Sequence, residues 1–299
     1  MVTEQKMPKT DYPALYQAAS STSQEAQKTY MQFVFSFLVL LVAASASFLF
    51  SSYSWLLSAL SALLFFGTLI LSLLLASKRY DETWYKGRAL AESVKTLTWR
   101  YIMRAKPYDD TQPSDYRTQF RDDLKKLLDN NRDMCLVLSD THENLEQITE
   151  KMESIRKSSL QDRKKFYQLY RIVEQRDWYT TKAIYNKRMA KRWFIAMIIF
   201  QSLAIISALI KIPNPDWNLL PVQVFAVSAT AVLSWIQIKR FQDLATSYSI
   251  TVQDIGMVKV ELPVVVDEQT FSDFVINVET AFSREHTEWL ARRNIRKSG

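Results

Sequence analysis

Two long apolar stretches interrupt an otherwise strongly polar sequence. No Asp, Glu, Lys, Arg or His occurs from Thr29 to Ser77, and from Trp193 to Ile238 only Lys211 and Asp216 are charged. A bilayer core about 30 Å thick is crossed by about 20 helical residues, so each stretch is long enough for two crossings and a short turn. We predict spans over residues 31–50, 54–77, 193–210 and 219–238.

Basic residues lie on one side of both predicted hairpins. The two turns carry almost no charge, whereas Lys and Arg follow the second span, precede the third and follow the fourth. Loops rich in Lys and Arg stay in the cytoplasm. We therefore predict that both termini and residues 78–192 are cytoplasmic. The basic residues are Lys78, Arg79, Lys86, Arg88, Lys182, Lys187, Arg188, Lys191, Arg192, Lys239 and Arg240.

The rest of the chain has a helical pattern. Only four glycines occur in 299 residues, which disfavours a β-sandwich, a dinucleotide-binding domain or a phosphate-binding loop. Behind the second span, small and aromatic residues recur every three or four positions, which predicts that this span continues into the cytoplasm as one long helix. This stripe comprises Tyr80, Trp84, Gly87, Ala91, Val94, Thr98 and Tyr101. A second stripe, near the C-terminus, comprises Phe274, Val278, Phe282, Glu285 and Trp289.

We interpret both stripes as packing seams rather than binding sites. The predicted fold class is all-α: an integral membrane protein whose four transmembrane helices form two hairpins with long cytoplasmic helical extensions.

Hydroxyl and amide side chains follow one face of two spans. In the second span these are Ser54, Ser58, Ser61, Thr68 and Ser72, and in the fourth Gln223, Thr230, Ser234 and Gln237. Such a face must meet protein or water, because lipid satisfies no hydrogen bond. Two interpretations remain open: helix packing within a hairpin, or the lining of a wet conduit in an oligomer. No span contains Asp, Glu or Arg, which disfavours a proton-coupled transporter, a voltage sensor or a filter of charged rings.

The sequence offers little chemistry for catalysis. Cys135 is the single cysteine, and the two histidines are His142 and His286, so we predict no intrachain disulfide, metal site or cofactor and no enzymatic activity. His286 lacks an accompanying nucleophile motif, and we interpret it as structural. The net charge of +7 concentrates beside the spans. Anionic lipid headgroups explain it, so we expect the lipid bilayer, and no nucleic acid, as partner.

Specific residues behind each hairpin carry a family resemblance. The first segment reads Trp84-Tyr85-x-x-Arg88-Ala89-x-Ala91-Glu92-Ser93-x-Lys95-Thr96-x-x-Trp99-Arg100-Tyr101. The second half has Tyr170-Arg171, Gln175, Trp178-Tyr179, Lys182-Ala183 and Asn186, then Glu279-x-x-x-Ser283-Arg284-Glu285-His286-Thr287-x-Trp289. The chain resembles the SLATT family, the two-transmembrane effectors associated with SMODS nucleotidyltransferases and SLOG sensor domains.

The resemblance divides the chain into two such units in tandem. We expect a cytoplasmic flank over residues 1–30, a first unit with its helical extension over 31–108, a cytoplasmic helical linker over 109–165 and a second unit over 166–299. The exit from the second span, Lys78-Arg79-Tyr80, recurs as Lys239-Arg240-Phe241 after the fourth, which indicates a weak duplication.

The resemblance also implies a function. It implies a multi-pass protein of the bacterial inner membrane, acting as the killing arm of an antiphage or other conflict system. As a homo-oligomer it would open a pore when an upstream sensor or a nucleotide-signal synthase encoded nearby is triggered. We find no cyclic-nucleotide pocket in the sequence, so we expect another chain to sense such a signal. Two alternatives remain: a constitutive ion channel or small-solute transporter, and a non-conducting anchor that recruits a cytoplasmic partner.

Overall fold

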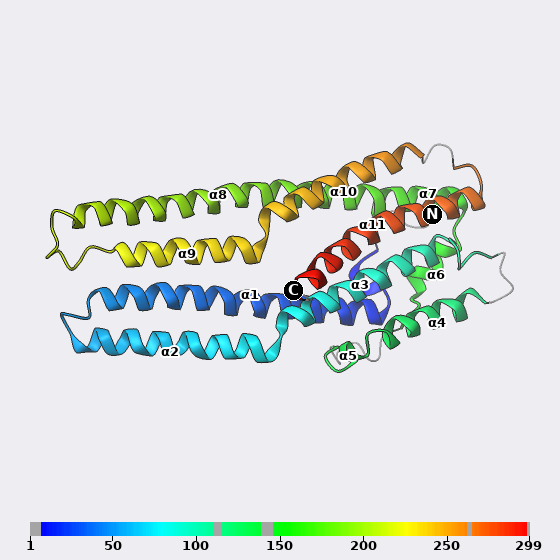
Figure 1. Ribbon diagram of the computed structural model, residues 1–299. Helices are drawn as coiled ribbons and strands as arrows, with labels where there is room; N and C mark the ends of the chain where they lie inside the picture. Colours follow the sequence, from blue (N-terminus) through cyan, green and yellow to red (C-terminus); the bar gives the residue numbers. More distant parts are fainter. Residues whose placement is uncertain (1–6, 111–114, 139–145, 262–264, 298–299) are drawn as a thin grey trace. The chain divides into compact units, whose positions relative to one another are not determined.

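The computed structural model describes residues 7–110, 115–138, 146–261 and 265–297, with side chains described as far as Phe282. All regular secondary structure in these residues is helical, as predicted (Figure 1). The elements are η1 (Lys9–Asp11), α1 (Ala14–Leu49), α2 (Trp55–Lys78), α3 (Tyr80–Ile102), α4 (Tyr116–Asp129), α5 (Arg132–Cys135), α6 (Glu150–Arg156), α7 (Leu160–Tyr167), the π-helical segment η3 (Gln168–Val173), α8 (Glu174–Lys211), α9 (Val222–Lys239), α10 (Phe241–Glu261) and α11 (Glu268–Lys297).

These helices form two compact units. The polar unit comprises Met1–Ala26, Asp81–Thr181 and Ser247–Gly299, and the apolar unit comprises Gln27–Tyr80 and Lys182–Thr246. The boundaries between the units fall within α1, at the start of α3, within the first part of α8 and within α10, so α1, α8 and α10 each belong to both units.

Four helical stretches are long and apolar enough to cross a membrane, which confirms the predicted number. They are Ala14–Leu49, Trp55–Ile102, Leu160–Lys211 and Val222–Val260. Their apolar side chains are largely exposed; Leu63 and Leu73, for example, are 65% and 62% exposed. A monomeric soluble protein rarely exposes so large an apolar surface. Such exposure is typical of helices that cross a membrane.

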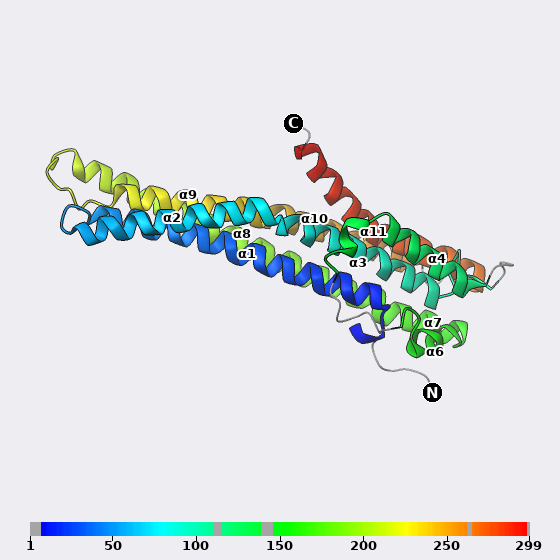
Figure 2. The same cartoon turned by 90° about the horizontal axis from the view of Figure 1, so that it is seen from below.

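Within the apolar unit, α2 lies alongside α1 (Figures 1 and 2). The Ser61 hydroxyl donates a hydrogen bond of 3.0 Å to the Ala44 carbonyl oxygen. A Cβ placed on Gly67 would lie 3.4 Å from Leu40 Cδ1, so the missing side chain permits close approach. A buried cluster of Val34, Leu38 and Ala231 then joins α1 to α9.

The prediction that the second span continues beyond the membrane as one unbroken helix is wrong at Arg79. Although the helical stretch extends to Ile102, α2 ends at Lys78 and Arg79 adopts a left-handed conformation with φ of 45° before α3 begins. Arg240 makes the same break with φ of 51° between α9 and α10. A left-handed residue ends regular helical hydrogen bonding. The repeated Lys-Arg-aromatic sequence thus corresponds to the same helix break in both halves.

The seam predicted on α3 is buried. Trp84, Gly87, Ala91, Val94, Thr98 and Tyr101 are buried, whereas Tyr80 is half-buried. The partner of this seam was not predicted, because α1 begins at Ala14, inside the segment interpreted only as a flank. A Cβ on Gly87 would lie 3.1 Å from Ser23 Cβ and 3.2 Å from the Ala19 oxygen, both on α1. The first turns of α1 therefore pack directly on α3.

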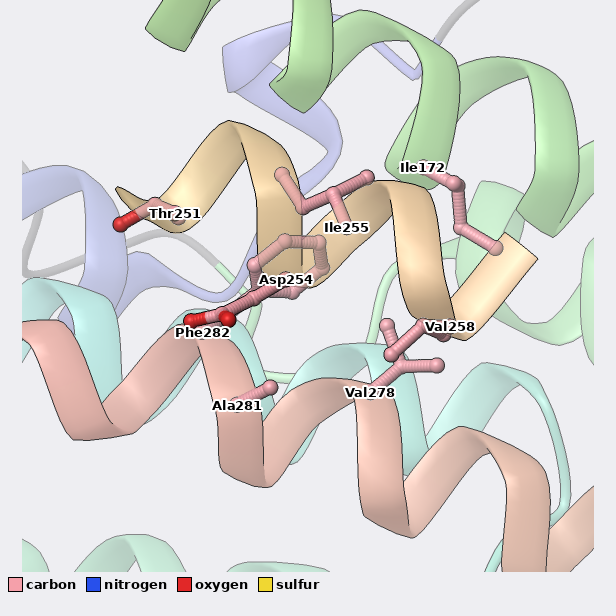
Figure 3. A pocket seen from close by; sticks show the side chains of 8 residues that line it. All are labelled: Ile172, Thr251, Asp254, Ile255, Val258, Val278, Ala281 and Phe282. Atoms are coloured by element: carbon pink, nitrogen blue, oxygen red, sulfur yellow. The ribbon is translucent and has the colours of Figure 1, made fainter. Parts of the chain in front are cut away.

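The C-terminal stripe also packs as predicted where its side chains are described. Phe274, Val278 and Phe282 are all buried, and Figure 3 shows Val278 and Phe282 on α11 facing α10 and Ile172. Glu285 and Trp289 lie beyond the described side chains.

Candidate functional site: a buried charge cluster, a cleft and exposed polar faces

A buried ion pair links η3 to α11 in the polar unit. Arg171 Nη2 lies 2.6 Å from Glu279 Oε2, and the two side chains are 2% and 0% exposed. Arg171 Nε donates to Glu279 Oε1 at 2.8 Å, and the Tyr167 hydroxyl donates to the same oxygen at 2.9 Å. Burial disfavours the cation, but the opposing charge and hydrogen bonds of Glu279 outweigh it and raise the pKa of Arg171.

Two further buried arginines hold the chain that follows α3. Arg156 donates to the carbonyl oxygens of Tyr101 at 2.7 Å and Tyr108 at 2.8 Å. Arg163 donates to the Met103 carbonyl oxygen at 2.9 Å. Backbone oxygens left over at a helix end need donors, and these guanidinium groups supply them.

A cleft of about 360 Å³ opens in the polar unit next to the ion pair. Its walls come from the segment before α1 and its first turns, from the middle of α3, and from η3 with the start of α8. The lining residues are Met7, Lys9, Tyr12, Tyr16, Ser20, Gln24, Arg88, Glu92, Lys95, Trp99, Tyr170, Arg171, Glu174, Gln175, Trp178 and Tyr179.

Two cationic groups in this cleft lack a full set of partners. Lys95 is 15% exposed, and its ammonium nitrogen lies 3.9 Å from Glu92 Oε2, too far for a hydrogen bond. Burial lowers the pKa of Lys95, although the charge of Glu92 opposes the shift. Arg171 Nη1 is buried and has no hydrogen-bond partner among the described residues. Burial also raises the pKa of Tyr16 to about 12, so its phenol stays protonated.

A second hollow, between α10 and α11, is much smaller (Figure 3). It holds about 10 Å³, which is room for a single water molecule at most. Among the described residues, no group of three or more His, Cys, Asp or Glu side chains could hold a metal ion.

The family-motif residues divide between the buried core and the cleft. Arg88, Glu92, Trp99, Trp178 and Tyr179 line the cleft. Other motif residues do not line the cleft. Trp84 is buried, and Arg100 Nη2 donates a hydrogen bond of 3.2 Å to Thr280 Oγ1. The buried Asn186 side chain donates a hydrogen bond of 2.8 Å to the carbonyl oxygen of Lys182, whose own side chain is exposed. The side chains of Ser283, Glu285, His286 and Trp289 lie beyond those described.

The polar stripe of α2 is partly buried within the apolar unit. Ser61 and Thr68 are buried, whereas Ser58 and Ser72 are exposed. Ser54 caps the start of α2 by accepting from the Leu56 amide at 3.2 Å. The hydroxyls of Thr68 and Ser72 donate to backbone oxygens of their own helix, so only Ser61 bonds to the neighbouring helix α1.

The polar stripe of α9 is mostly exposed. Gln223, Thr230 and Gln237 are exposed and Ser234 is half-buried. The hydroxyls of Thr230 and Ser234 donate to backbone oxygens of α9 itself, at 3.0 and 2.9 Å. These hydroxyls thus bond within α9, and Gln223 at the start of the helix lines an open hollow with Leu41, Ser45 and Phe48 of α1 and Phe65 of α2.

Sequence reasoning missed Gln201 and the two buried arginines Arg156 and Arg163. Gln201 lies near the middle of the third span on an exposed face of α8, and its amide bonds to no residue that the structure describes. Its sequence signal was a lone amide inside an apolar run. Arg163 and Arg171 lie eight residues, or about two helical turns, apart on the helical stretch that begins at Leu160, a spacing that marks one face of a helix, whereas Arg156 ends the separate helix α6.

The helical fold and the exposed apolar surface together define a multi-pass helical membrane protein. The model of SMODS and SLOG-associating 2TM effector domain 3 matches residues 13–164, and that of domain 1 of the same description matches residues 167–289. The chain belongs to the SLATT family and carries two SLATT domains in tandem. Neither a curated protein nor a solved structure gave a match.

Proposed function

We propose that this chain is an effector of a bacterial conflict system that permeabilises the inner membrane as a homo-oligomer when an upstream sensor is triggered. The polar unit and both termini lie in the cytoplasm, where the basic residues beside the spans meet anionic headgroups. The description of both family domains as two-transmembrane effectors supports this role.

The observation that carries the proposal is the exposed amide of Gln201. In a lone chain it would face hydrocarbon halfway across the bilayer, where no water satisfies its hydrogen bonds. The exposed stripe of α9 has the same difficulty at Gln223 and Gln237, nearer the ends of that span. A second copy of the chain, or water between copies, satisfies all three amides.

The hydrogen bonds of these three amides are too weak to drive assembly of the oligomer alone. An interhelical hydrogen bond in a bilayer contributes about 0.6 kcal/mol on average. Three amides therefore select which faces meet rather than drive assembly by themselves. With no acidic or arginine side chain inside the spans, the resulting conduit is weakly selective.

The test measures membrane potential with a dye in cells that express the chain with and without its genomic neighbours. Gln201→Leu combined with Gln223→Leu and Gln237→Leu should abolish the loss of potential without reducing membrane insertion. The matched control is Gln253→Leu, the same change at an exposed position of α10 in the polar unit. It should leave the loss of potential unchanged.

Each other outcome selects a different function. Persistent depolarisation by the triple variant would refute the assignment of these faces. Conductance in liposomes without a trigger, and without growth arrest in cells, would identify a constitutive channel or transporter. No loss of potential under any condition would leave a non-conducting anchor, and changes at Trp84 and Arg88 should then abolish its activity.

A further inference from the structure

The polar unit contains a cleft that the proposed function does not use. Its volume of about 360 Å³ falls in the range of small-molecule sites. All its walls belong to the same compact unit.

The side chains that line the cleft carry a net positive charge. Four lining side chains are cationic, Lys9, Arg88, Lys95 and Arg171, and two are acidic, Glu92 and Glu174. Glu279 neutralises Arg171 from behind, and the remaining lining groups still carry one net positive charge. An anion entering the cleft therefore meets an attractive field.

Three donors of residues that line the cleft lack a hydrogen-bond acceptor, among them Trp99 Nε1, which is buried without a partner among the described residues. Arg171 Nη1 is buried without a partner among the described residues, and the Lys95 ammonium lies 3.9 Å from its nearest carboxylate oxygen. A buried donor left unsatisfied is costly to the fold, so such groups are uncommon without a ligand or an ordered water. Glu92 balances the charge of Lys95 at 3.9 Å but accepts no hydrogen bond from it.

Aromatic rings form the remaining walls. Trp99, Tyr16 and Trp178 line the cleft from three different helices; Trp178 is 40% exposed, whereas Trp99 and Tyr16 are 1% and 8% exposed and lie deeper in its wall. Flat rings favour a flat ligand through stacking and apolar contact.

We infer that this cleft binds a small organic anion that joins a phosphate or carboxylate group to a planar ring. The anionic group lies beside Lys95 and Arg171, and the ring lies against the exposed ring of Trp178. Binding is a property of the polar unit and does not depend on whether the apolar unit conducts.

The test uses the full chain in lipid nanodiscs and isothermal titration calorimetry. The probe is 1-naphthyl phosphate; 1-naphthol and inorganic phosphate serve as its two halves, and empty nanodiscs correct for partition into lipid. Saturable binding of one probe per chain is expected, with each half at least about tenfold weaker.

Lys95→Met tests the position of the site. It should weaken binding of 1-naphthyl phosphate by about tenfold or more, because it removes one cation from a poorly solvated place. Its unfolding temperature should not fall, since the lysine charge is disfavoured by burial. The matched control is Lys157→Met: this exposed lysine also lies 3.9 Å from its carboxylate partner, Glu153, but outside the cleft.

Three results would overturn the inference. The first is the absence of saturable heat from 1-naphthyl phosphate at millimolar concentration. The second is unchanged binding by the Lys95→Met chain, which would place the probe elsewhere. The third is equal affinity for 1-naphthol, which would make the cleft an apolar site with no preference for anions.

Discussion

Breaking the buried ion pair between Arg171 and Glu279 should destabilise the polar unit severely. Glu279→Gln keeps the size of the side chain but leaves the guanidinium charge without its counterion in a site that is 2% exposed. Removing one partner of a buried pair costs about 3–5 kcal/mol, because the remaining charge is uncompensated. Since each 1.4 kcal/mol is about tenfold, local opening should become roughly two to three and a half orders of magnitude more frequent.

Amide hydrogen exchange measured by mass spectrometry on the full chain in nanodiscs reports this opening directly. Protection should fall in η3 and in the part of α11 around Glu279, since these segments are joined by the pair. The double variant Arg171→Met/Glu279→Leu replaces the pair with apolar side chains of similar size. It should restore protection to within about 1 kcal/mol of the wild type, because replacing a whole buried pair is often neutral or stabilising.

An exposed pair on α8 supplies the control. Arg176 Nη2 lies 2.8 Å from Asp177 Oδ1, with side chains 39% and 62% exposed. Asp177→Asn should change stability by less than about 1 kcal/mol, as is usual for surface pairs. Unchanged protection in Glu279→Gln, or equal losses in Glu279→Gln and Asp177→Asn, would refute the reasoning.

Three further predictions concern single positions. Gly87→Val should lower the stability of the polar unit by about 1–3 kcal/mol, because a Cβ there already lies 3.2 Å from the Ala19 backbone oxygen; an unchanged unfolding temperature would contradict the close packing. Burial disfavours the charged form of Glu153, but hydrogen bonds from Tyr101 and Arg117 outweigh this effect and lower the pKa of Glu153 below the ordinary 4.5. The ionised Glu153 therefore stabilises the fold above pH 4.5, and this stabilisation is lost as the pH falls through the pKa of the folded state. Glu153→Gln should therefore reduce stability at neutral pH and flatten its acid dependence below pH 4.5 in denaturant unfolding, and a slope equal to that of the wild type would count against this role. Arg79→Gly should stabilise the chain by up to about 1 kcal/mol in thermal unfolding, because glycine adopts a φ of 45° without strain, and a loss of stability would show that the arginine side chain matters more than its conformation.

The membrane-spanning helices could be predicted because lipid imposes a strong and local constraint. Uncharged length alone located all four, and the predicted limits of the second span, residues 54–77, differ from those of α2 by a single residue at each end. The break at Arg79 could not be predicted in the same way. A basic residue carries no helix-ending signal, and the helical stripe that begins at Tyr80 follows Arg79 directly, without a Gly or Pro between the span and the stripe.

The polar unit depends on contacts between segments that are distant in the sequence. Arg171 forms an ion pair with Glu279, and Gly87 packs on the first turns of α1. In both cases the contacting residues are far apart in the sequence. Periodicity identified the faces that pack, but it does not say which face meets which. For the same reason the cleft was not predicted, because its walls come from three separate parts of the chain.

Some residues of the motif behind each hairpin stabilise the fold, and we assign another, Lys95, to ligand binding. Tyr179 and Glu279 are buried with apolar or hydrogen-bonded neighbours, so folding alone explains them. Lys95 is different, because burial opposes its charge and its nearest carboxylate is too distant to compensate through a hydrogen bond. Lys95 also lines the cleft, where its ammonium group can meet an anionic ligand. Substitutions at Trp99 or Glu279 should therefore lower stability and binding together, whereas Lys95→Met should lower binding alone.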